Sequence, residues 1–172
     1  MKLVKISVLG GAVAAALAMG VAQADAPAAS PSTTLNAATS VAAKCTTLTA
    51  NQISFDAYVP DEVNDNTKDT TVTVRCTLNT PITIAMDKGT NGSSTSARKL
   101  KITDGTHADT LSYNLYSNAG RTTLWGEGSD KVSKIGEGLL KTSTYNVYGK
   151  IPAAQDVTPG SYADAVTVTV AY

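Results

Sequence analysis

The segment SYADAVTVTVAY (residues 161–172) closes the sequence, and valine alternates with threonine through most of it. Successive side chains of a β-strand point to opposite faces, so this period of two predicts a strand with one apolar face. That face would carry Val166, Val168, Val170 and Tyr172. No residues follow to form a closing partner. We therefore expect that the strand lies inside a complete sheet or that its neighbour comes from another polypeptide, in which case these four residues are candidates for an acceptor groove.

The beginning of the chain has the pattern of a secretory signal peptide. Lys2 and Lys5 give a basic start, residues 8–18 form an Ala/Val/Leu-rich run, and Ala22-Gln23-Ala24 has the small–x–small cleavage pattern. The apolar run is shorter than the roughly 20 residues that cross a bilayer. We interpret it as a cleaved signal, with a retained membrane anchor as the alternative, and expect an exported chain that begins at Asp25.

The composition fits one exported domain of ordinary size. Removing residues 1–24 would leave 148 residues with twelve basic and fourteen acidic side chains, a net charge of −2. Nucleic acids and anionic membranes require a concentrated basic patch, so this balance argues against both as partners. The abundance of threonine and the low content of lysine favour strands over helices.

Alternating patterns recur along the mature chain and predict an all-β sandwich or barrel. A period of two runs from residue 33 to residue 45 and places Leu35, Val41 and Cys45 on one face. After the signal, no stretch has a sustained helical period. Further short strands are expected, separated by turns such as Pro159-Gly160, at residues 53–55, 70–77, 82–84, 100–102, 111–115 and 145–149.

Cys45 and Cys76 are the only cysteines. In an exported protein, two cysteines are most simply explained by one disulfide bond. A pair of free thiols or a metal site is the alternative. A metal would need more ligands, and the only histidine, His107, is distant in sequence.

No motif predicts an enzyme, a cofactor or a metal site. His107 lies in a polar turn without a Gly-x-Ser-x-Gly motif, so we expect a solvated side chain; a serine hydrolase is the alternative. We expect the single tryptophan, Trp125, to pack in the core or at a sheet edge, the alternative being a carbohydrate platform. The remaining candidate is an acidic cluster that lacks the spacing of a calcium loop, at Asp61, Glu62, Asp65 and Asp69.

Three blocks follow one another in the second half of the chain: Leu111-Ser112-Tyr113-Asn114-Leu115-Tyr116 with Ala119-Gly120-Arg121-Thr122 and Trp125-Gly126; Tyr148-Gly149-Lys150-Ile151-Pro152 with Gln155; and Gly160-Ser161-Tyr162-Ala163-Asp164 before the Val/Thr segment and Tyr172. In this order, and with Cys45 and Cys76 in the first half of the mature chain, they resemble the spore coat protein U domain family, whose members include subunits of archaic chaperone–usher pili. Glu127 matches an acidic residue of the family.

The resemblance implies an incomplete immunoglobulin-like β-sandwich that is completed by a donor strand from another chain. It implies as partners a periplasmic chaperone, an outer-membrane usher, and other copies of the chain or related subunits. The expected organisation is a signal peptide over residues 1–24, a flexible arm over 25–36 that is the candidate donor, and the sandwich domain over 37–172. The donor side chains would be Leu35, Ala37 and Val41.

The function implied is a structural subunit of a secreted surface fibre that passes through the periplasm to the cell surface and supports adhesion or biofilm formation. Two alternatives use the same fold. One is a non-fibrous coat protein of a spore or cell, and the other is a secreted carbohydrate-binding sandwich.

Overall fold

The computed structural model describes residues 30–172 and divides the chain into two units, Met1–Thr39 and Ser40–Tyr172. In the first unit, residues 30–39 are exposed and belong to no strand or helix. The predicted signal peptide and the first five residues of the predicted arm lie outside the described residues. Within residues 30–172, no helix combines the length and the hydropathy of a membrane span.

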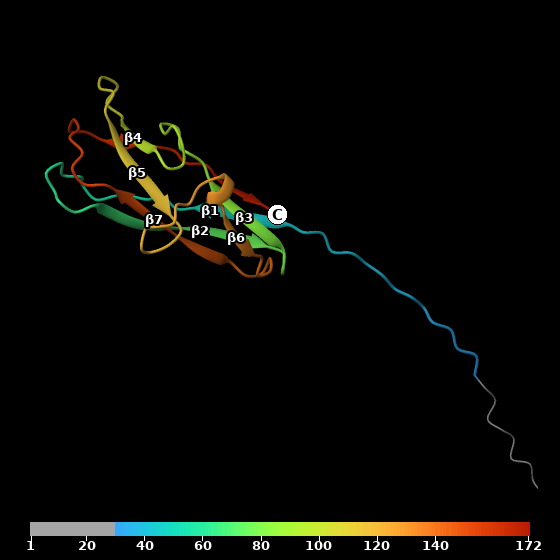
Figure 1. Ribbon diagram of the computed structural model, residues 1–172. Helices are drawn as coiled ribbons and strands as arrows, with labels where there is room; N and C mark the ends of the chain where they lie inside the picture. The colour runs from blue at the N-terminus through green and yellow to red at the C-terminus, as the bar shows by residue number, and fades with distance from the viewer. Residues whose placement is uncertain (1–29) are drawn as a thin grey trace, which may run out of the picture. The chain divides into compact units, whose positions relative to one another are not determined.

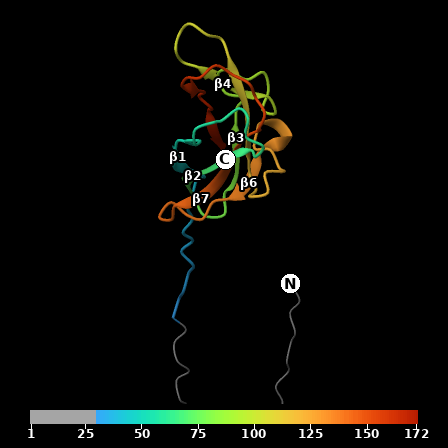
Figure 2. The ribbon, with the colours of Figure 1, turned by 90° about the vertical axis from the view of Figure 1, so that its left-hand side faces the viewer.

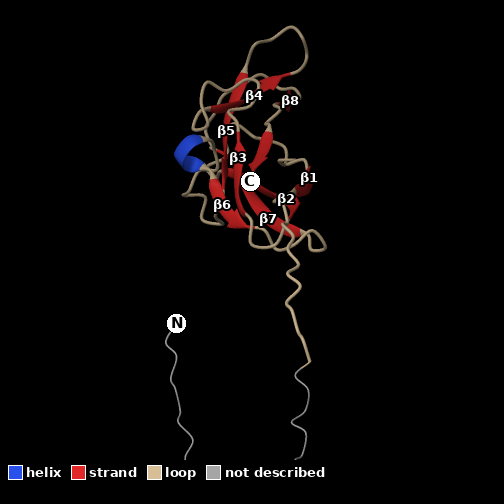
Figure 3. Ribbon diagram, turned by 90° about the vertical axis from the view of Figure 1, so that its right-hand side faces the viewer, coloured by secondary structure: helices blue, strands red, loops and turns tan. Residues whose placement is uncertain are grey.

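Residues 40–172 form a sandwich of two antiparallel sheets, which confirms the predicted all-β, immunoglobulin-like fold (Figure 1). The described helical structure is one 3₁₀ turn, Gly128–Asp130, blue in Figure 3. The smaller sheet has the order β6 (Val132–Ile135), β3 (Pro81–Met86), β9 (Val168–Ala171). The larger sheet has the order β1 (Cys45–Ala50), β2 (Asn66–Cys76), β7 (Ser143–Ile151), β5 (Thr110–Tyr116), β4 (Arg98–Ile102), β8 (Tyr162–Ala163).

The period of two in the sequence becomes the two faces of each sheet. In β3 and β5, every second side chain is buried between the sheets and the others face outward or are half-buried. Trp125 packs in this core, as expected, and its indole Nε1 donates to the Ile84 carbonyl at 2.9 Å. The largest contributors to the core are Val72, Val74, Ile82, Ile84, Met86, Leu111, Tyr113, Leu115, Trp125, Val147 and Ile151.

Three predicted strands differ in the structure. Residues 53–55 belong to no strand, because the backbone pairing of this segment with β2 ends at Asn51. The alternating residues before Cys45 belong to no strand, because the first backbone pairing of this segment begins at Cys45 opposite Cys76. The segment 161–172 is divided: β8 pairs with β4 of the larger sheet and β9 with β3 of the smaller one. The dark red segment of Figure 2 therefore crosses from one sheet to the other, which a period of two cannot reveal.

The predicted disulfide between Cys45 and Cys76 is present and joins the first residue of β1 to the last residue of β2. Lys44, the residue before Cys45, is hydrogen-bonded to Thr77, the residue after Cys76. Thr77 N donates to the Lys44 carbonyl at 2.8 Å, and Lys44 N donates to Thr77 Oγ1 at 2.8 Å. The point where the arm joins the domain is thus fixed by covalent and hydrogen bonds.

Replacing both cysteines, Cys45→Ala with Cys76→Ala, should lower the free energy of unfolding by about 3–4 kcal/mol, because the bond closes a long loop and restricts the unfolded chain. Urea unfolding of the mature protein measures this difference. Reduction of the parent protein should give a similar loss, and a loss below about 1 kcal/mol in both would contradict the prediction.

Candidate strand-acceptor groove

A groove of about 670 Å³ opens between the two sheets on the side where β9 ends the smaller sheet. Residues 50–58 form one wall, and Ala163, Asp164, Val166 and Val168 form the other. The floor consists of core side chains from β2, β3, β4, β5 and β7: Val72, Met86, Leu100, Leu111, Tyr113, Leu115, Val147 and Ile151. The groove is therefore a long, mainly apolar opening into the core.

The strand edge beside the groove has no partner within residues 30–172. β9 pairs with β3 on one side, from Val168 opposite Met86 to Ala171 opposite Thr83, and it ends the described sheet on the other side. Across the groove, residues 51–58 belong to no strand. A free edge beside an apolar groove is the arrangement that receives an added strand, because backbone groups bind its backbone and the groove takes alternate side chains.

The wall formed by residues 51–58 is held by specific contacts with the larger sheet. Asn51 N donates to the Thr71 carbonyl at 3.0 Å, which continues the pairing of β1. The Tyr58 hydroxyl donates to the Pro152 carbonyl at 3.2 Å and accepts from Gln155 N at 2.7 Å. The wall is therefore ordered although it has no strand partner on its groove side among the described residues.

Gly149 of β7 leaves room for two side chains of this wall. A Cβ at this position would lie 2.2 Å from Ile53 Cδ1 and 2.8 Å from Phe55 Cζ. Phe55 then reaches Tyr113 in an edge-to-face arrangement, with ring centroids 6.3 Å apart. Gly149 thus leaves space for Ile53 and Phe55 to pack over the larger sheet, where both line the groove.

The opposite wall is positioned by two carboxylates. Asp164 accepts a hydrogen bond from the Tyr113 hydroxyl at 2.7 Å and others from Asn91 at 3.0 and 3.1 Å. Asp87 accepts from Thr167 N and from Gly89 N, each at 2.9 Å. Gly89 has φ +76°, and a Cβ there would lie 2.0 Å from the Asp164 carboxylate, so only glycine fits.

These contacts explain two pKa shifts. Burial, and then the hydrogen bond to Asp164, raises the pKa of Tyr113. Burial opposes the ionised form of Asp87, but the hydrogen bonds from Thr167 and Gly89 outweigh it and hold the pKa of this carboxyl below its ordinary value. The wall formed by residues 163–168 is therefore connected to the core through Tyr113, which stays neutral at neutral pH, and through Asp87, which stays ionised.

Arg98 connects the two sheets behind this wall. Its side chain is fully buried and donates only to backbone carbonyls: those of Met86, Asp87, Thr95 and Trp125, at 2.8–3.0 Å. Burial lowers the pKa of Arg98. Because β4 belongs to the larger sheet and Met86 ends β3 of the smaller one, this guanidinium holds the sheets together next to the groove.

The structure places the predicted acceptor residues as follows. Val166 and Val168 line the groove, Val170 packs against the core farther along β9, and Tyr172 is exposed beyond the end of β9. The predicted donor residues Leu35 and Val41 are exposed, 93% and 82%, and Ala37 is exposed as well. Their assignment as donor and acceptor stays a prediction.

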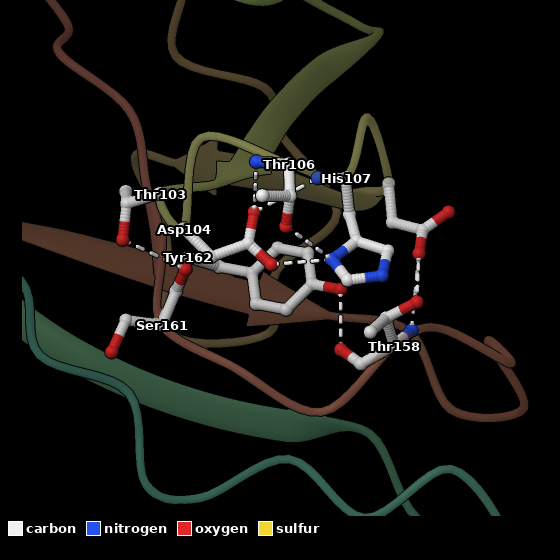
Figure 4. Close-up of polar contacts among 8 residues, drawn as sticks. Thr103, Asp104, Thr106, His107, Thr158, Ser161 and Tyr162 are labelled. Carbon is white, nitrogen blue, oxygen red and sulfur yellow. Dashed lines mark hydrogen bonds and ion pairs between the residues drawn. The ribbon is translucent and has the colours of Figure 1, made fainter.

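His107 is solvated and helps to close the turn between β4 and β5 (Figure 4). Its Nδ1 lies 2.5 Å from Asp104 Oδ2, and Asp104 Oδ1 accepts from the backbone N of Thr106 and of His107. Asp104 raises the pKa of His107. Within residues 30–172, the hydroxyl group that is hydrogen-bonded to the imidazole belongs to Thr106. No serine hydroxyl of these residues is bonded to His107 as a nucleophile would be.

The other candidates have structural partners. Trp125 is 1% exposed and cannot stack on a sugar. In the acidic cluster, Asp65 pairs with Lys150 at 3.1 Å and Asp69 pairs with Arg121 at 2.5 Å. Within the described part of the chain, no group of three or more acidic, histidine or cysteine side chains is arranged to hold a metal.

Sequence reasoning missed the residues that shape the walls. Gln155, Gly149 and Asp164 fell within the blocks that carry the family resemblance, but nothing in their spacing gave them a role. Nothing in the sequence indicated a structural role for Arg98, because charged side chains are usually exposed. Their functions follow from contacts between residues as far apart as Asp164 and Tyr113.

An open-edged antiparallel β-sandwich with an apolar groove defines the class of this protein. The chain belongs to the spore coat protein U domain family, whose model matches residues 32–169. It is 30% identical to Protein U of Myxococcus xanthus over 129 residues, covering 70% of this chain and 71% of that protein.

Two solved structures are similar. One comes from the crystal structure of the CsuC–CsuE chaperone–tip adhesion subunit pre-assembly complex of archaic chaperone–usher Csu pili from Acinetobacter baumannii. It has a TM-score of 0.56 and 24% identity, and the match covers 77% of this chain and 40% of that chain. At this identity the likeness shows the fold. The other is HdaB, the minor tip subunit of the E. coli Hda pilus, with a TM-score of 0.42, 16% identity and coverage of 74% and 79%.

Gly149→Ala should lower the free energy of unfolding by about 1–3 kcal/mol, because the added methyl group displaces Ile53 and Phe55 from the larger sheet. Thermal unfolding of the mature protein measures the change. Gly120→Ala is the matched control, since a Cβ at Gly120 meets only ordinary contacts at 3.5 Å or more. Equal stability of the two variants would contradict the role given to Gly149.

Asp87 should make part of the stability depend on pH. Its pKa is lowered in the folded state, so its stabilising contribution is present above the pKa of the unfolded carboxyl, near 4, and is lost as the pH falls through the lower folded value. Asp87→Asn should therefore be less stable than the parent at pH 6, with the difference decreasing toward pH 2. Urea unfolding across this range, with the exposed-loop variant Asp61→Asn as control, tests the sign; a difference that grows at low pH would contradict it.

Proposed function

We propose that this protein is a structural subunit of a secreted surface fibre, an archaic chaperone–usher pilus, assembled by donor-strand exchange. The observation that carries the proposal is the free edge of β9 beside an apolar groove. Membership of the spore coat protein U domain family and the fold shared with a pilus subunit support it.

In this function, the arm of one subunit fills the groove of the next. The odd-numbered residues Leu35, Ala37 and Val41 share a face of an extended arm, and Leu35 and Val41 have no packing of their own in the described chain. Backbone hydrogen bonds to β9 would supply affinity, and these side chains would enter the groove. An open apolar edge invites aggregation, so a periplasmic chaperone would cover it before the outer-membrane usher exchanges it for the arm.

The fibre would serve adhesion or biofilm formation at the cell surface. The second candidate is a coat protein that covers a spore or cell without ordered fibres, and the description of the family model as a spore coat domain favours it. Electron microscopy of producing cells with and without the gene distinguishes them: the pilus predicts thin fibres that are lost on deletion, and the coat predicts loss of an amorphous layer.

Val168→Asp should abolish assembly, because a carboxylate would replace an apolar side chain that lines the groove, and burying it beneath a donor strand is costly. Thr169→Asp is the matched control, since Thr169 directly follows Val168 in β9 and its side chain is exposed on the opposite face. The measurement is the formation of oligomers by the mature protein that survive detergent and dissociate on strong heating.

Deleting residues 25–36 should also abolish these oligomers while leaving a folded domain. If the intact protein is monomeric and no more prone to associate than the deletion variant, donor-strand exchange between copies is refuted. If Val168→Asp and Thr169→Asp assemble equally well, the groove is not the acceptor.

A further inference from the structure

Several large apolar side chains that remain exposed lie at the two ends of the domain. Leu78, Leu140 and Ile135, the last residue of β6, are exposed at the end where the arm joins, and Val59 and Val63 are exposed on a loop at the opposite end. Among residues 40–172, Val41, Leu48 and Tyr172 are exposed as well. Exposed apolar clusters at specific places mark contact surfaces. The groove alone does not explain why apolar side chains are exposed at these two ends.

The end where the arm joins, here called the arm end, is one hydrogen-bonded unit. It consists of Lys44, the turn 77–80 and the loop 135–141. Lys44 is bonded to Thr77, and Asn79 N donates to the Gly136 carbonyl at 2.8 Å. Leu78, Ile135 and Leu140 are therefore carried rigidly beside the residue from which the arm leaves, at the right-hand end of the domain in Figure 1.

The opposite end carries the loop 59–65, here called the mouth loop because Pro60 lines the groove. Glu62 N donates to the Val59 carbonyl at 3.2 Å and forms a turn. Val63, 88% exposed, projects from this loop. The mouth loop thus stands where a strand lying in the groove would leave it.

The two ends have opposite charge. Asp61 and Glu62 of the mouth loop form no ion pair within residues 30–172. At the arm end, Lys44 and the neighbouring Lys134 of β6 likewise form no described ion pair, while Lys141 pairs with Glu137 at 3.2 Å. Lys134 Nζ lies 5.4 Å from the centroid of the Tyr145 ring. An acidic surface with exposed valines is therefore complementary to a basic surface with exposed leucine and isoleucine.

The direction of β9 brings these two surfaces together in a fibre. β9 runs toward its own arm end, since Val168 lies opposite Met86 and Ala171 lies opposite Thr83, near the start of β3. Every described strand pair is antiparallel. An arm added in the same antiparallel sense runs away from the arm end of the acceptor and leaves the groove beside the mouth loop.

The arm is short enough to enforce contact. If Val41 lies in the groove, three residues separate it from Cys45, and the four steps between these two Cα atoms span at most about 14 Å. The arm end of the donor must then lie against the mouth loop of the acceptor. A parallel arm would instead bring two arm ends together, with Lys44 and Lys134 of both copies repelling each other.

We propose that the arm end of one copy docks on the mouth loop of the next copy, with Leu78, Ile135 and Leu140 against Val59 and Val63, and Lys44 and Lys134 against Asp61 and Glu62. This inference rests on the proposed donor-strand function. The contact is heterologous, because each copy offers a different surface on each side, and it repeats along a line. It sets the spacing and angle between successive subunits.

Charge exchange tests the electrostatic part in the full mature protein. Glu62→Lys should slow the formation of arm-dependent oligomers at low ionic strength by roughly tenfold, and adding Lys44→Glu to it should restore most of the rate. Both effects should disappear at high salt, because the screening length becomes shorter than the separation of the charges. An unchanged rate in Glu62→Lys, or no restoration in the double variant, would overturn the charge pairing.

Cross-linking tests the contact itself. Val63→Cys protein mixed with Leu140→Cys protein should form, on mild oxidation, dimers that survive boiling and disappear on reduction. The control replaces the second partner with Asn146→Cys, which is exposed on β7 away from both ends and should not cross-link. Heat-dissociable oligomers without the Val63–Leu140 cross-link would overturn this interface and leave the proposed function intact. Absence of all arm-dependent oligomers would overturn both.

Discussion

Along β9, one row of backbone groups pairs with β3, and the other row faces the groove without a partner strand among the described residues. This free edge is the constraint on which the rest of the structure depends. The core side chains beneath it, such as Leu111 and Val147, line the floor of the groove. An added strand would satisfy the backbone edge and the apolar floor at the same time, because alternate side chains of a strand point to the same face.

The groove is open in the structure, and polar contacts explain how its walls are held in place. Arg98 of β4, in the larger sheet, binds four carbonyls that include that of Met86 in the smaller sheet, and Asp87 and Asp164 hold the segment before β9. Buried polar groups are costly unless they are satisfied, so such a network favours one arrangement over a collapsed one. Gly149 leaves the space in which Ile53 and Phe55 of one wall pack over the larger sheet. Preorganised walls reduce the ordering cost of binding a strand.

The disulfide determines the point at which the arm leaves the domain. It fixes the first residue of β1 next to Thr77, so that the arm leaves from a rigid end of the domain. In the proposed function, the donor arm and the acceptor groove are two different binding surfaces of one chain. Copies of the chain would then associate head to tail and form a line of subunits.

The sequence by itself determined the class of fold, the disulfide and the apolar face of the last strand. These features depend on local alternation, on the number of cysteines and on blocks whose order resembles one family. Contacts between distant residues were decided only by the tertiary structure. The alternation of residues 161–172 did not reveal that β8 and β9 belong to different sheets, because the crossing depends on pairing with Ile102 and Met86. The alternation before Cys45 predicted a strand, but in the structure residues 33–44 pair with no strand of the domain. The role of Arg98 was equally invisible, since its charge is satisfied by carbonyls that only the folded chain brings together.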